Sequence, residues 1–184
     1  MQSFPTLRTE RLLLNQPQHT DIPSIVEYAN HEAISAMTLN IPYPYQAEDA
    51  VFWLNMSIEG FRQQNRYVFA IRDRETEAFM GGIGMSINTQ HNRGTLGYWM
   101  GVPFWSRGFM TEAAAAVLQF GFETLQLNRI EATHLVGNPA SGQVMLKNGM
   151  IYEGELRDLY RKGEVYRTVK QYRLTRAEYD GQIN

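Results

Sequence analysis

The segment from Phe104 to Ala113 has the residue types of an anion-binding loop. It reads Phe-Trp-Ser-Arg-Gly-Phe-Met-Thr-Glu-Ala and lies between a strand-like run closed by Pro103 and an apolar helix pattern that continues to about Leu125. Gly108 allows the backbone to pass close to a bulky partner, and the first turn of the following helix presents N–H groups that lack an intrahelical acceptor. A loop that leads into a helix in this way is a site for an anion, most often a phosphate.

Two common phosphate loops do not fit the sequence. A P-loop needs Gly-x-x-x-x-Gly-Lys-Ser/Thr, and no glycine in this chain precedes a Lys-Ser or Lys-Thr pair. The dinucleotide fingerprint needs Gly-x-Gly-x-x-Gly at the start of the first helix of a parallel unit. The run Gly81-Gly82-Ile83-Gly84 is glycine-rich but lies inside an expected strand, so we interpret its glycines as bulge or packing positions.

The loop resembles that of the GNAT acetyltransferases, which hold the pyrophosphate of coenzyme A with a Gln/Arg-x-x-Gly-x-Gly/Ala motif. In one large branch the first position is aromatic and the segment reads roughly Tyr-Trp-x-x-Gly-x-Ala-Thr-Glu-Ala, which is similar to residues 104–113. Met110 departs from the usual small residue at this position. Its side chain must therefore point away from the cofactor, while its backbone N–H can still bind the cofactor. The resemblance implies that coenzyme A is bound by Ser106, Arg107, Gly108, Phe109, Met110 and Thr111.

A second block carries the resemblance further along the chain. It comprises Arg-Ile-Glu-Ala from Arg129, Asn-Pro-Ala-Ser from Asn138 and Val-Met-Leu-Lys-Asn-Gly-Met from Val144. The family form is roughly Arg-Ile-x-Ala, Asn-x-x-Ser and Val-x-x-Lys-x-Gly-Phe/Met, and the gap between Trp105 and Asn138 falls in its usual range. The opening Thr-Glu-Arg-Leu-Leu-Leu from Thr9 also resembles the start of the GNAT branch that acetylates ribosomal-protein N-termini.

Several residues of this block have structural alternatives. Asn138, which precedes Pro139, is in a favoured pattern for a helix cap, and for Lys147 the alternative is a solvated helix residue. By the resemblance, Asn138 bonds the pantetheine arm and Lys147 contacts the 3′-phosphate of coenzyme A. We interpret Glu131 and His134, which lie on an expected strand, as structural rather than catalytic.

Transfer of an acetyl group from a thioester to an amine makes three chemical demands. A base or an ordered water must take the amine proton, a fixed N–H must stabilise the carbonyl oxygen, and an acid should protonate the departing thiolate. The glycines at 97 and 101 permit a bulge. The resemblance places the pantetheine arm against the backbone of Met100, Gly101 and Val102, where one N–H faces the thioester oxygen.

The acid is assigned from the resemblance, whereas the base stays open. Many GNAT enzymes use a tyrosine four residues after the small residue of the asparagine block, but that position is Met145 here, which cannot donate a proton. In the ribosomal-protein branch the serine of Asn-x-x-Ser has the acid role, so Ser141 is the expected catalytic acid, with a polar first-turn helix residue as the alternative. Glu153, Glu155 and Asp158 are candidates for the base.

These residues need a sheet that opens between two helices. The hydrophobic pattern and the turn residues predict strand, helix, helix, three strands, helix, strand, helix and two strands in that order. A crossover helix makes the strands at 95–102 and 129–136 parallel, with helices at about 108–125 and 139–148 after them. We predict an α+β GNAT fold, in which a mostly antiparallel seven-stranded sheet with a splayed central parallel pair is flanked by four helices, in a single domain spanning residues 1–184.

The outer helices follow from the same patterns. We expect the first helix to run from Thr20 or Asp21 to about Asn30, and the second from Ala47 to Gln64. In the second helix the apolar residues at helical spacing are interpreted as core: Val51, Leu54, Ile58 and Phe61.

Composition restricts the class of protein. The 184 residues carry a formal net charge of −2 and no long basic run, which argues against nucleic-acid binding. The absence of cysteine excludes disulfides, cysteine nucleophiles and thiolate metal sites. No run approaches the ~18 apolar residues of a membrane span, and the N-terminus lacks the apolar core of a signal peptide. We therefore expect a cytoplasmic protein that uses no metal and does not bind a membrane, and exposed sheet edges make a homodimer one expectation.

The sequence favours an acetyl-CoA-dependent N-acetyltransferase that acts on a primary amine, foremost a protein N-terminal amine of the ribosomal-protein type. A small-molecule acceptor (a polyamine, an aminoglycoside or an amino acid) is the alternative within this class. A non-catalytic acyl-CoA-binding sensor is the alternative outside it, and the intact Asn138 and Ser141 favour catalysis. An NTP-binding enzyme is disfavoured because the Walker-type lysine and an obvious magnesium carboxylate are missing.

Overall fold

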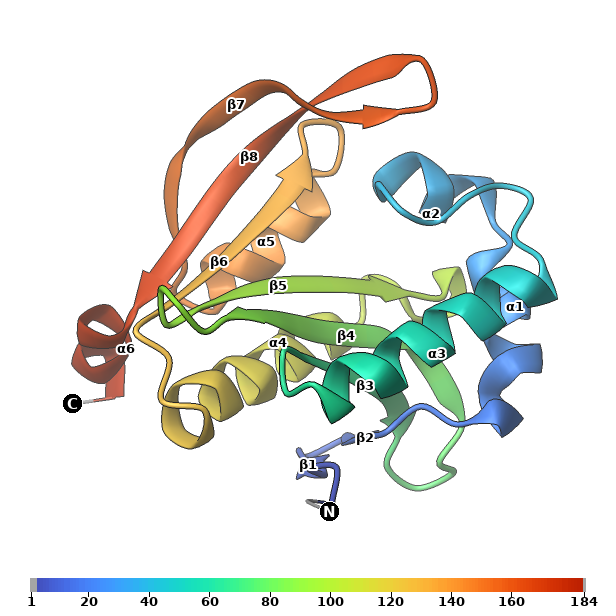
Figure 1. Cartoon of the computed structure of the whole chain (residues 1–184), viewed down its shortest axis with the longest axis horizontal. Helices are drawn as coiled ribbons and strands as arrows, with labels where there is room; N and C mark the ends of the chain where they lie inside the picture. Colours follow the sequence, from blue (N-terminus) through green and yellow to red (C-terminus); the bar gives the residue numbers. More distant parts are fainter. Residues whose placement is uncertain (1–2, 184) are drawn as a thin grey trace.

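A single twisted sheet runs through the molecule and carries helices on both faces (Figure 1). The computed structural model describes residues 3–183 of the chain. Its strands are β1 (Leu7–Arg8), β2 (Leu12–Asn15), β3 (Arg66–Asp73), β4 (Phe79–Asn88), β5 (Arg93–Met100), β6 (Arg129–Leu135), β7 (Ile151–Lys162) and β8 (Val165–Thr175). Across the sheet these eight strands follow the order β1-β2-β3-β4-β5-β6-β8-β7.

Helices cover both faces of the sheet. They are α1 (Ile22–Ala29), α2 (Glu32–Met37), α3 (Ala47–Arg62), α4 (Phe109–Gln119), α5 (Pro139–Lys147) and α6 (Arg176–Ile183). Helices α1 and α3 pack on one face of the sheet, and α4 and α5 on the other (Figure 1). Helix α4 continues into one π-helical turn, Phe120–Thr124, and the chain then enters β6.

Two hydrophobic clusters correspond to these two faces. The larger cluster lies between the sheet and α4, where Phe69, Met85 and Val117 are completely buried. The smaller cluster joins Ile25 of α1 to Phe79 of β4 on the opposite face. The sheet is therefore buried on both faces at β3 and the first half of β4, whereas Thr95 and Gly97 of β5 are exposed on one face.

The central strands β5 and β6 are parallel because α4 connects them as a crossover. Their register covers residues 93–96 of β5 and ends at the pair Leu96↔Ala132. Beyond this point β5 stays paired with β4 through Met100, and β6 stays paired with β8 through Leu135. The two strands therefore diverge, which confirms the predicted splayed pair. The β4–β5 register shows no shift, so the divergence does not use the expected bulge.

The predicted fold class is confirmed, with three elements beyond the expected set. The segment expected as one opening strand turns back on itself, so that Leu7 of β1 pairs with Leu14 of β2 and the sheet has eight strands rather than seven. The described residues form six α-helices rather than four, and the additional ones are α2 and α6. Because α2 has only six residues and α6 is mostly polar, neither shows a long apolar period.

The predicted core face of α3 is partly wrong. Leu54 is fully buried, but Val51 is 38% exposed. The buried side of the helix carries Ala50, Leu54, Ser57 and Gly60 instead. Small residues let α3 approach the sheet closely, since a Cβ at Gly60 would lie 2.6 Å from Cβ of Arg66 at the start of β3.

Candidate active site

The predicted anion-binding segment forms the turn into α4. Ser106 and Gly108 both have positive φ angles, +60° and +79°, so the backbone winds tightly before the helix begins at Phe109. The bond that opens the helix runs from the N–H of Glu112 to the carbonyl oxygen of Gly108 at 3.1 Å. The N–H groups of residues 109–111 precede this bond and lack an intrahelical acceptor, which is the arrangement that binds an anion.

The other predicted residues of this segment lie around the same turn. Val102 begins a 3-10 helix, Val102–Phe104, that leads from β5 to the loop. Ser106 and Arg107 are exposed, and the Arg107 guanidinium lies 4.9 Å from the centre of the Phe109 ring. The Met110 side chain packs against the larger cluster, so it points away from the loop, as the resemblance requires.

Arg11, in the turn between β1 and β2, holds this segment in place. Its guanidinium pairs with Glu112 at 2.7 Å, donates to the carbonyl oxygen of Arg107 at 3.1 Å and lies over the Phe109 ring. The Thr9 hydroxyl also donates to Glu112, at 2.6 Å. Burial alone would raise the pKa of Glu112, but the hydrogen bonds from Thr9 and Arg11 outweigh burial and hold this pKa below its usual value. Glu112 therefore stays ionised and fixes Arg11 beside the loop.

The opening between β5 and β6 exposes backbone groups of Tyr98 and Met100. Gly101 donates its N–H to the carbonyl oxygen of Met80 in β4 at 2.9 Å. Because antiparallel strands bond through alternate residues, Tyr98 and Met100 turn their backbone groups to the other side, toward β6. The Met100 carbonyl oxygen accepts the indole N–H of Trp105 at 2.6 Å. Of the three residues expected to contact the cofactor arm, Met100 is therefore the one whose N–H faces the opening.

Ser141 meets Tyr98 where the two strands have separated. The Tyr98 hydroxyl oxygen lies 2.9 Å from Ser141 Oγ and 3.0 Å from the Ser141 carbonyl oxygen. Burial raises the pKa of Tyr98 to about 12, although the bond with Ser141 acts in the opposite direction. Tyr98 is therefore protonated at neutral pH and can donate its proton to Ser141. Its hydroxyl is a group of the site that sequence reasoning missed.

Asn138 has the expected helix-cap role. Its Oδ1 accepts the N–H of Ser141 at 3.2 Å, and its Nδ2 donates to the carbonyl oxygen of Met37 in α2 at 3.3 Å. Asn138 thus fixes the first turn of α5 and ties it to α2. The cap places the Ser141 side chain at the mouth of the opening, and the contact of Asn138 with the cofactor arm stays a prediction.

Lys147 is exposed in the last turn of α5. It lines an open groove of about 780 Å³ between α4, α5 and α6, together with Glu112 and Tyr179. Its neighbour Asn148 donates from Nδ2 to the carbonyl oxygen of Thr111 at 3.2 Å. The last turn of α5 therefore lies beside the first turn of α4.

Of the three candidate bases, Glu153 is unsuitable. Its carboxylate pairs with Arg129, which also lies 3.4 Å from Glu131. The hydrogen bond from Arg129 is the main cause that holds the pKa of Glu153 below its usual value, so this carboxylate is a weak base. Glu131 belongs to the same ion cluster, in line with its structural interpretation. Glu155 and Asp158 are exposed on β7 and stay candidates.

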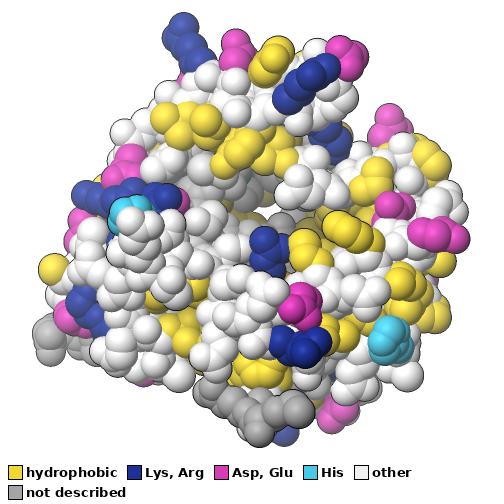
Figure 2. Space-filling model, in the orientation of Figure 1, with side chains coloured by type: hydrophobic (Ala, Val, Ile, Leu, Met, Phe, Trp, Pro, Cys, Tyr) yellow, Lys and Arg dark blue, Asp and Glu magenta, His cyan; other side chains and the backbone are white. Residues whose placement is uncertain are grey.

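The hairpin of β7 and β8 is tied to α2 by Lys162. The ammonium group donates to the carbonyl oxygens of Ser35, Thr38 and Ile41 at 2.6, 2.9 and 3.1 Å. Burial, with a smaller contribution from Arg167, holds the pKa of Lys162 below its usual value. Figure 1 shows the hairpin reaching toward α2, and Figure 2 shows a hollow beneath the hairpin that is rimmed by hydrophobic side chains.

A known protein family matches most of the chain. The acetyltransferase (GNAT) domain matches residues 11–151. The chain belongs to this family. Across 181 residues it is 33% identical to the uncharacterized N-acetyltransferase p20 of Bacillus licheniformis, with 96% of this chain and 99% of p20 covered. The putative ribosomal N-acetyltransferase YdaF of Bacillus subtilis (strain 168) is 31% identical over 98 residues, which cover 53% of each protein.

Solved GNAT structures share the fold described above. A GNAT-family acetyltransferase from Bacillus anthracis superposes with a TM-score of 0.84 and 22% identity, over 94% of this chain and 99% of that protein. As a GNAT N-acetyltransferase, the protein is an acyltransferase. Within residues 3–183 no helix is long and apolar enough to cross a bilayer. The same residues hold no group of three or more His, Asp or Glu side chains placed to bind a metal ion.

The residues on this side of the sheet fit coenzyme A. The N–H groups at the start of α4 suit its pyrophosphate, and the groove beside Lys147 has room for its adenosine part. The opening between β5 and β6 offers the backbone of Tyr98 and Met100 to an extended arm.

Proposed function

We propose that this GNAT enzyme transfers the acetyl group of acetyl-CoA to the N-terminal amine of a protein, of the ribosomal-protein type. The observation that carries acetyl transfer is the opening between β5 and β6, which starts beyond the last pair, Leu96↔Ala132, where Tyr98 meets Ser141. Two features support a protein acceptor. The hollow under the hairpin is open on the molecular surface (Figure 2), and the name of the relative YdaF refers to a ribosomal acceptor.

The predicted cofactor residues of the loop and of α5 contact different parts of coenzyme A in this proposal. Acetyl-CoA, when bound, supplies the acetyl group as a thioester that an amine can attack. The N–H groups of residues 108–111 bind the pyrophosphate, with the side chains of Ser106 and Arg107 on the outer side of the loop. Lys147 pairs with the 3′-phosphate, and Asn138 bonds the pantetheine arm.

The Met100 N–H is the proposed donor to the thioester oxygen. It points into the opening between β5 and β6 and is fixed by the pairing of β5 with β4, which continues to Met100. A preorganised N–H of this kind stabilises the negative charge that develops on the oxygen in the transition state. Glu155, Asp158 or an ordered water takes the proton of the amine.

Ser141 is the proposed acid, and Tyr98 decides whether its proton is free. When the Tyr98 hydroxyl donates to the Ser141 carbonyl oxygen, Ser141 Oγ can donate back to Tyr98. When Tyr98 donates to Ser141 Oγ, the serine hydrogen is free to point into the opening. The raised pKa of Tyr98 keeps its hydroxyl protonated, so Tyr98 can pass its proton to Ser141 as the serine proton goes to the thiolate, and Tyr98 then takes a proton from solvent.

A panel of amines tests the acceptor. Ribosomal-protein N-terminal peptides that begin with Ala or Ser are compared with spermine, an aminoglycoside and free amino acids, and the release of free coenzyme A is measured with a thiol reagent. Peptides with a blocked N-terminus are the control. The proposal predicts that the free peptides have the highest kcat/KM. A preference for a small amine would contradict the protein acceptor, and binding of acetyl-CoA without turnover of any amine would indicate a sensor.

The variant Ser141→Ala tests the acid with the preferred amine. Loss of a general acid lowers kcat by about 100-fold, while the affinity for coenzyme A measured by calorimetry stays nearly the same. The variant Ser141→Thr, which keeps a hydroxyl, should retain part of the turnover. Unchanged turnover of Ser141→Ala at saturating substrate would dismiss Ser141 as the acid.

A further inference from the structure

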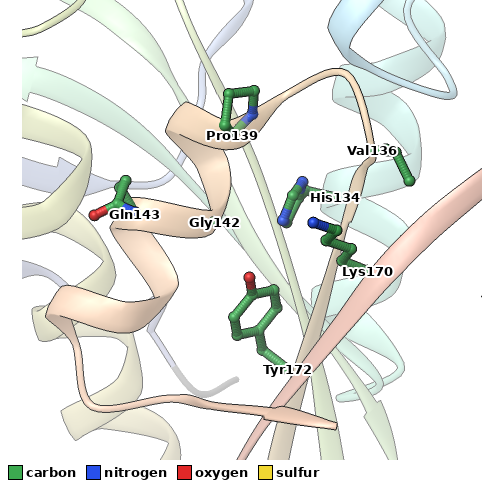
Figure 3. A pocket seen from close by; sticks show the side chains of 7 residues that line it. All are labelled: His134, Val136, Pro139, Gly142, Gln143, Lys170 and Tyr172. Carbon is green, nitrogen blue, oxygen red and sulfur yellow. The ribbon is translucent and has the colours of Figure 1, made fainter. Parts of the chain in front are cut away.

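A small pocket between α5, β6 and β8 contains a buried histidine nitrogen that has no hydrogen-bond partner within residues 3–183. The pocket has a volume of about 150 Å³, and it is lined by His134, Val136, Pro139, Gly142, Gln143, Lys170 and Tyr172 (Figure 3). Neither Tyr98 nor Ser141 belongs to its lining, so the pocket does not include the pair proposed for catalysis.

The state of the His134 ring follows from its contacts. His134 is only 6% exposed. Nδ1 lies 2.8 Å from the carbonyl oxygen of Leu135, so Nδ1 carries the proton and donates it there. Nε2 is then left as an acceptor, and it has no hydrogen-bond partner among the described residues. A buried polar atom without a partner is costly, so the pocket is prepared for a ligand that bonds to Nε2.

Gly142 keeps this pocket open. A Cβ at this position would lie 2.7 Å from Nε2 of His134 and 3.2 Å from the Tyr172 hydroxyl. Glycine in a helix interior is unfavourable relative to alanine. The glycine of α5 therefore provides space over two polar groups at the expense of helix stability.

The side chains that face His134 define the charge of the ligand. Lys170 lies opposite His134 in the β6–β8 register, and Figure 3 shows the Lys170 and Tyr172 side chains pointing toward the same space as the imidazole. The residues that α5 contributes to the lining, Pro139, Gly142 and Gln143, carry no titratable group. Burial, aided by Lys170, holds the pKa of His134 below its usual value, so its ring is neutral at neutral pH.

We propose that this pocket binds a small oxyanion, an inorganic phosphate or a carboxylate, together with one proton. The Lys170 ammonium group and the Tyr172 hydroxyl donate to the anion, and a proton taken up from solvent at His134 Nε2 provides a third donor. Cations are repelled by Lys170. The volume of the pocket admits only a ligand of a few heavy atoms. Because the anion brings a proton with it, its affinity rises as pH falls, by up to about tenfold per pH unit above the pKa of the free histidine.

Imidazole NMR gives a direct test, because the chain has four histidines. The exposed His19, His31 and His91 serve as internal references, and the His134 signal is identified by its loss in His134→Asn. The protein is titrated with pH in chloride, in inorganic phosphate and in acetate at equal ionic strength. The proposal predicts that phosphate or acetate raises the His134 titration midpoint by about one unit or more, as a nearby opposite charge does, while the other three midpoints stay fixed.

Two variants make the test specific. Lys170→Met removes the charge but keeps the length of the side chain, and it should weaken the anion effect on His134 roughly tenfold or more. The control Lys147→Met, on the groove side of α5, should leave the His134 response as in the wild type. Gly142→Ala should abolish the response by filling the pocket, and circular dichroism checks that the variant is folded.

The outcomes separate the two ligand sources and the failure of the proposal. A response to acetate alone assigns the pocket to carboxylates, and a response to phosphate alone assigns it to inorganic oxyanions. A His134 midpoint that is the same in all three salts overturns the proposal, as does an equal shift in Lys170→Met. If Gly142→Ala does not fold, the Lys170→Met comparison decides.

Discussion

The hydroxyl oxygen of Tyr98 lies 2.9 Å from Oγ of Ser141, although the two residues are 43 positions apart in the chain. Tyr98 belongs to β5 and Ser141 to the first turn of α5, and they meet where β5 and β6 have separated. This contact joins the strand that lines the cofactor opening to the helix that carries the proposed acid.

Removal of the Tyr98 hydroxyl tests the proposed proton path. We expect Tyr98→Phe to lower kcat about tenfold, less than the loss of the acid itself, because water can partly replace Tyr98 in reprotonating Ser141. The dissociation constant of coenzyme A, measured by calorimetry, should change little. A variant with full kcat would contradict the path, and a variant with weakened cofactor binding and unchanged kcat would assign Tyr98 a structural role.

The raised pKa of Tyr98 also predicts a loss of stability at high pH. The folded protein keeps the phenol proton up to about pH 12, whereas an unfolded tyrosine loses it near pH 10. The stability gained from this difference is present below about pH 10 and is lost as pH rises toward 12. Urea unfolding at about pH 9 and 11 should show a smaller loss of stability in Tyr98→Phe than in the wild type. Equal losses would contradict this assignment.

A side chain introduced at Gly108, the left-handed glycine before α4, tests whether this loop binds coenzyme A. At a φ of +79° valine is strained, and its branched side chain would stand beside the first N–H groups of α4. We expect Gly108→Val to abolish binding of coenzyme A in calorimetry. The matched control is Gly163→Val, because Gly163 has a φ of +59° in the turn of the hairpin and faces open space. Normal binding by Gly108→Val would refute the placement of the pyrophosphate.

Arg11 is expected to act through the loop rather than in the reaction. Arg11→Met breaks the partly exposed pair with Glu112 and the bond to the Arg107 carbonyl oxygen. Such a pair contributes up to about 1 kcal/mol, so coenzyme A should bind roughly fivefold more weakly while kcat is retained. The control is Arg157→Met, since the Arg157 side chain is 87% exposed on β7. A fall in kcat with unchanged cofactor affinity would contradict a purely positional role for Arg11.

The sequence is sufficient to predict the elements whose signals are local. The loop into α4 and the caps of α5 depend on residues within a few positions of one another, and the left-handed residue that ends α5, Gly149, is of the type typical of helix ends. The parallel pair follows from the length of the crossover between two strands. The predicted buried face of α3 differs from the observed one because small residues, including Ala50 and Ser57, form part of the helix surface that is buried. Apolar periodicity selects large side chains and therefore does not find such a surface.

Local sequence patterns do not predict the contacts between segments that are distant in the chain. Arg11 and Glu112 are 101 positions apart, and nothing local in either segment specifies the pairing. The bond between Tyr98 and Ser141 depends on the angle at which β5 and α5 meet. One signal for Tyr98 was present, because strand alternation puts its side chain on the same face as Leu96 and Met100.

A crystal structure of the protein with coenzyme A tests the central claim most directly. The account predicts the diphosphate against the N–H groups of residues 108–111 and the pantetheine arm between β5 and β6, with the sulfur directed toward Ser141. A structure in which coenzyme A is bound elsewhere while the segment from Trp105 to Thr111 makes no contact with it would contradict the account.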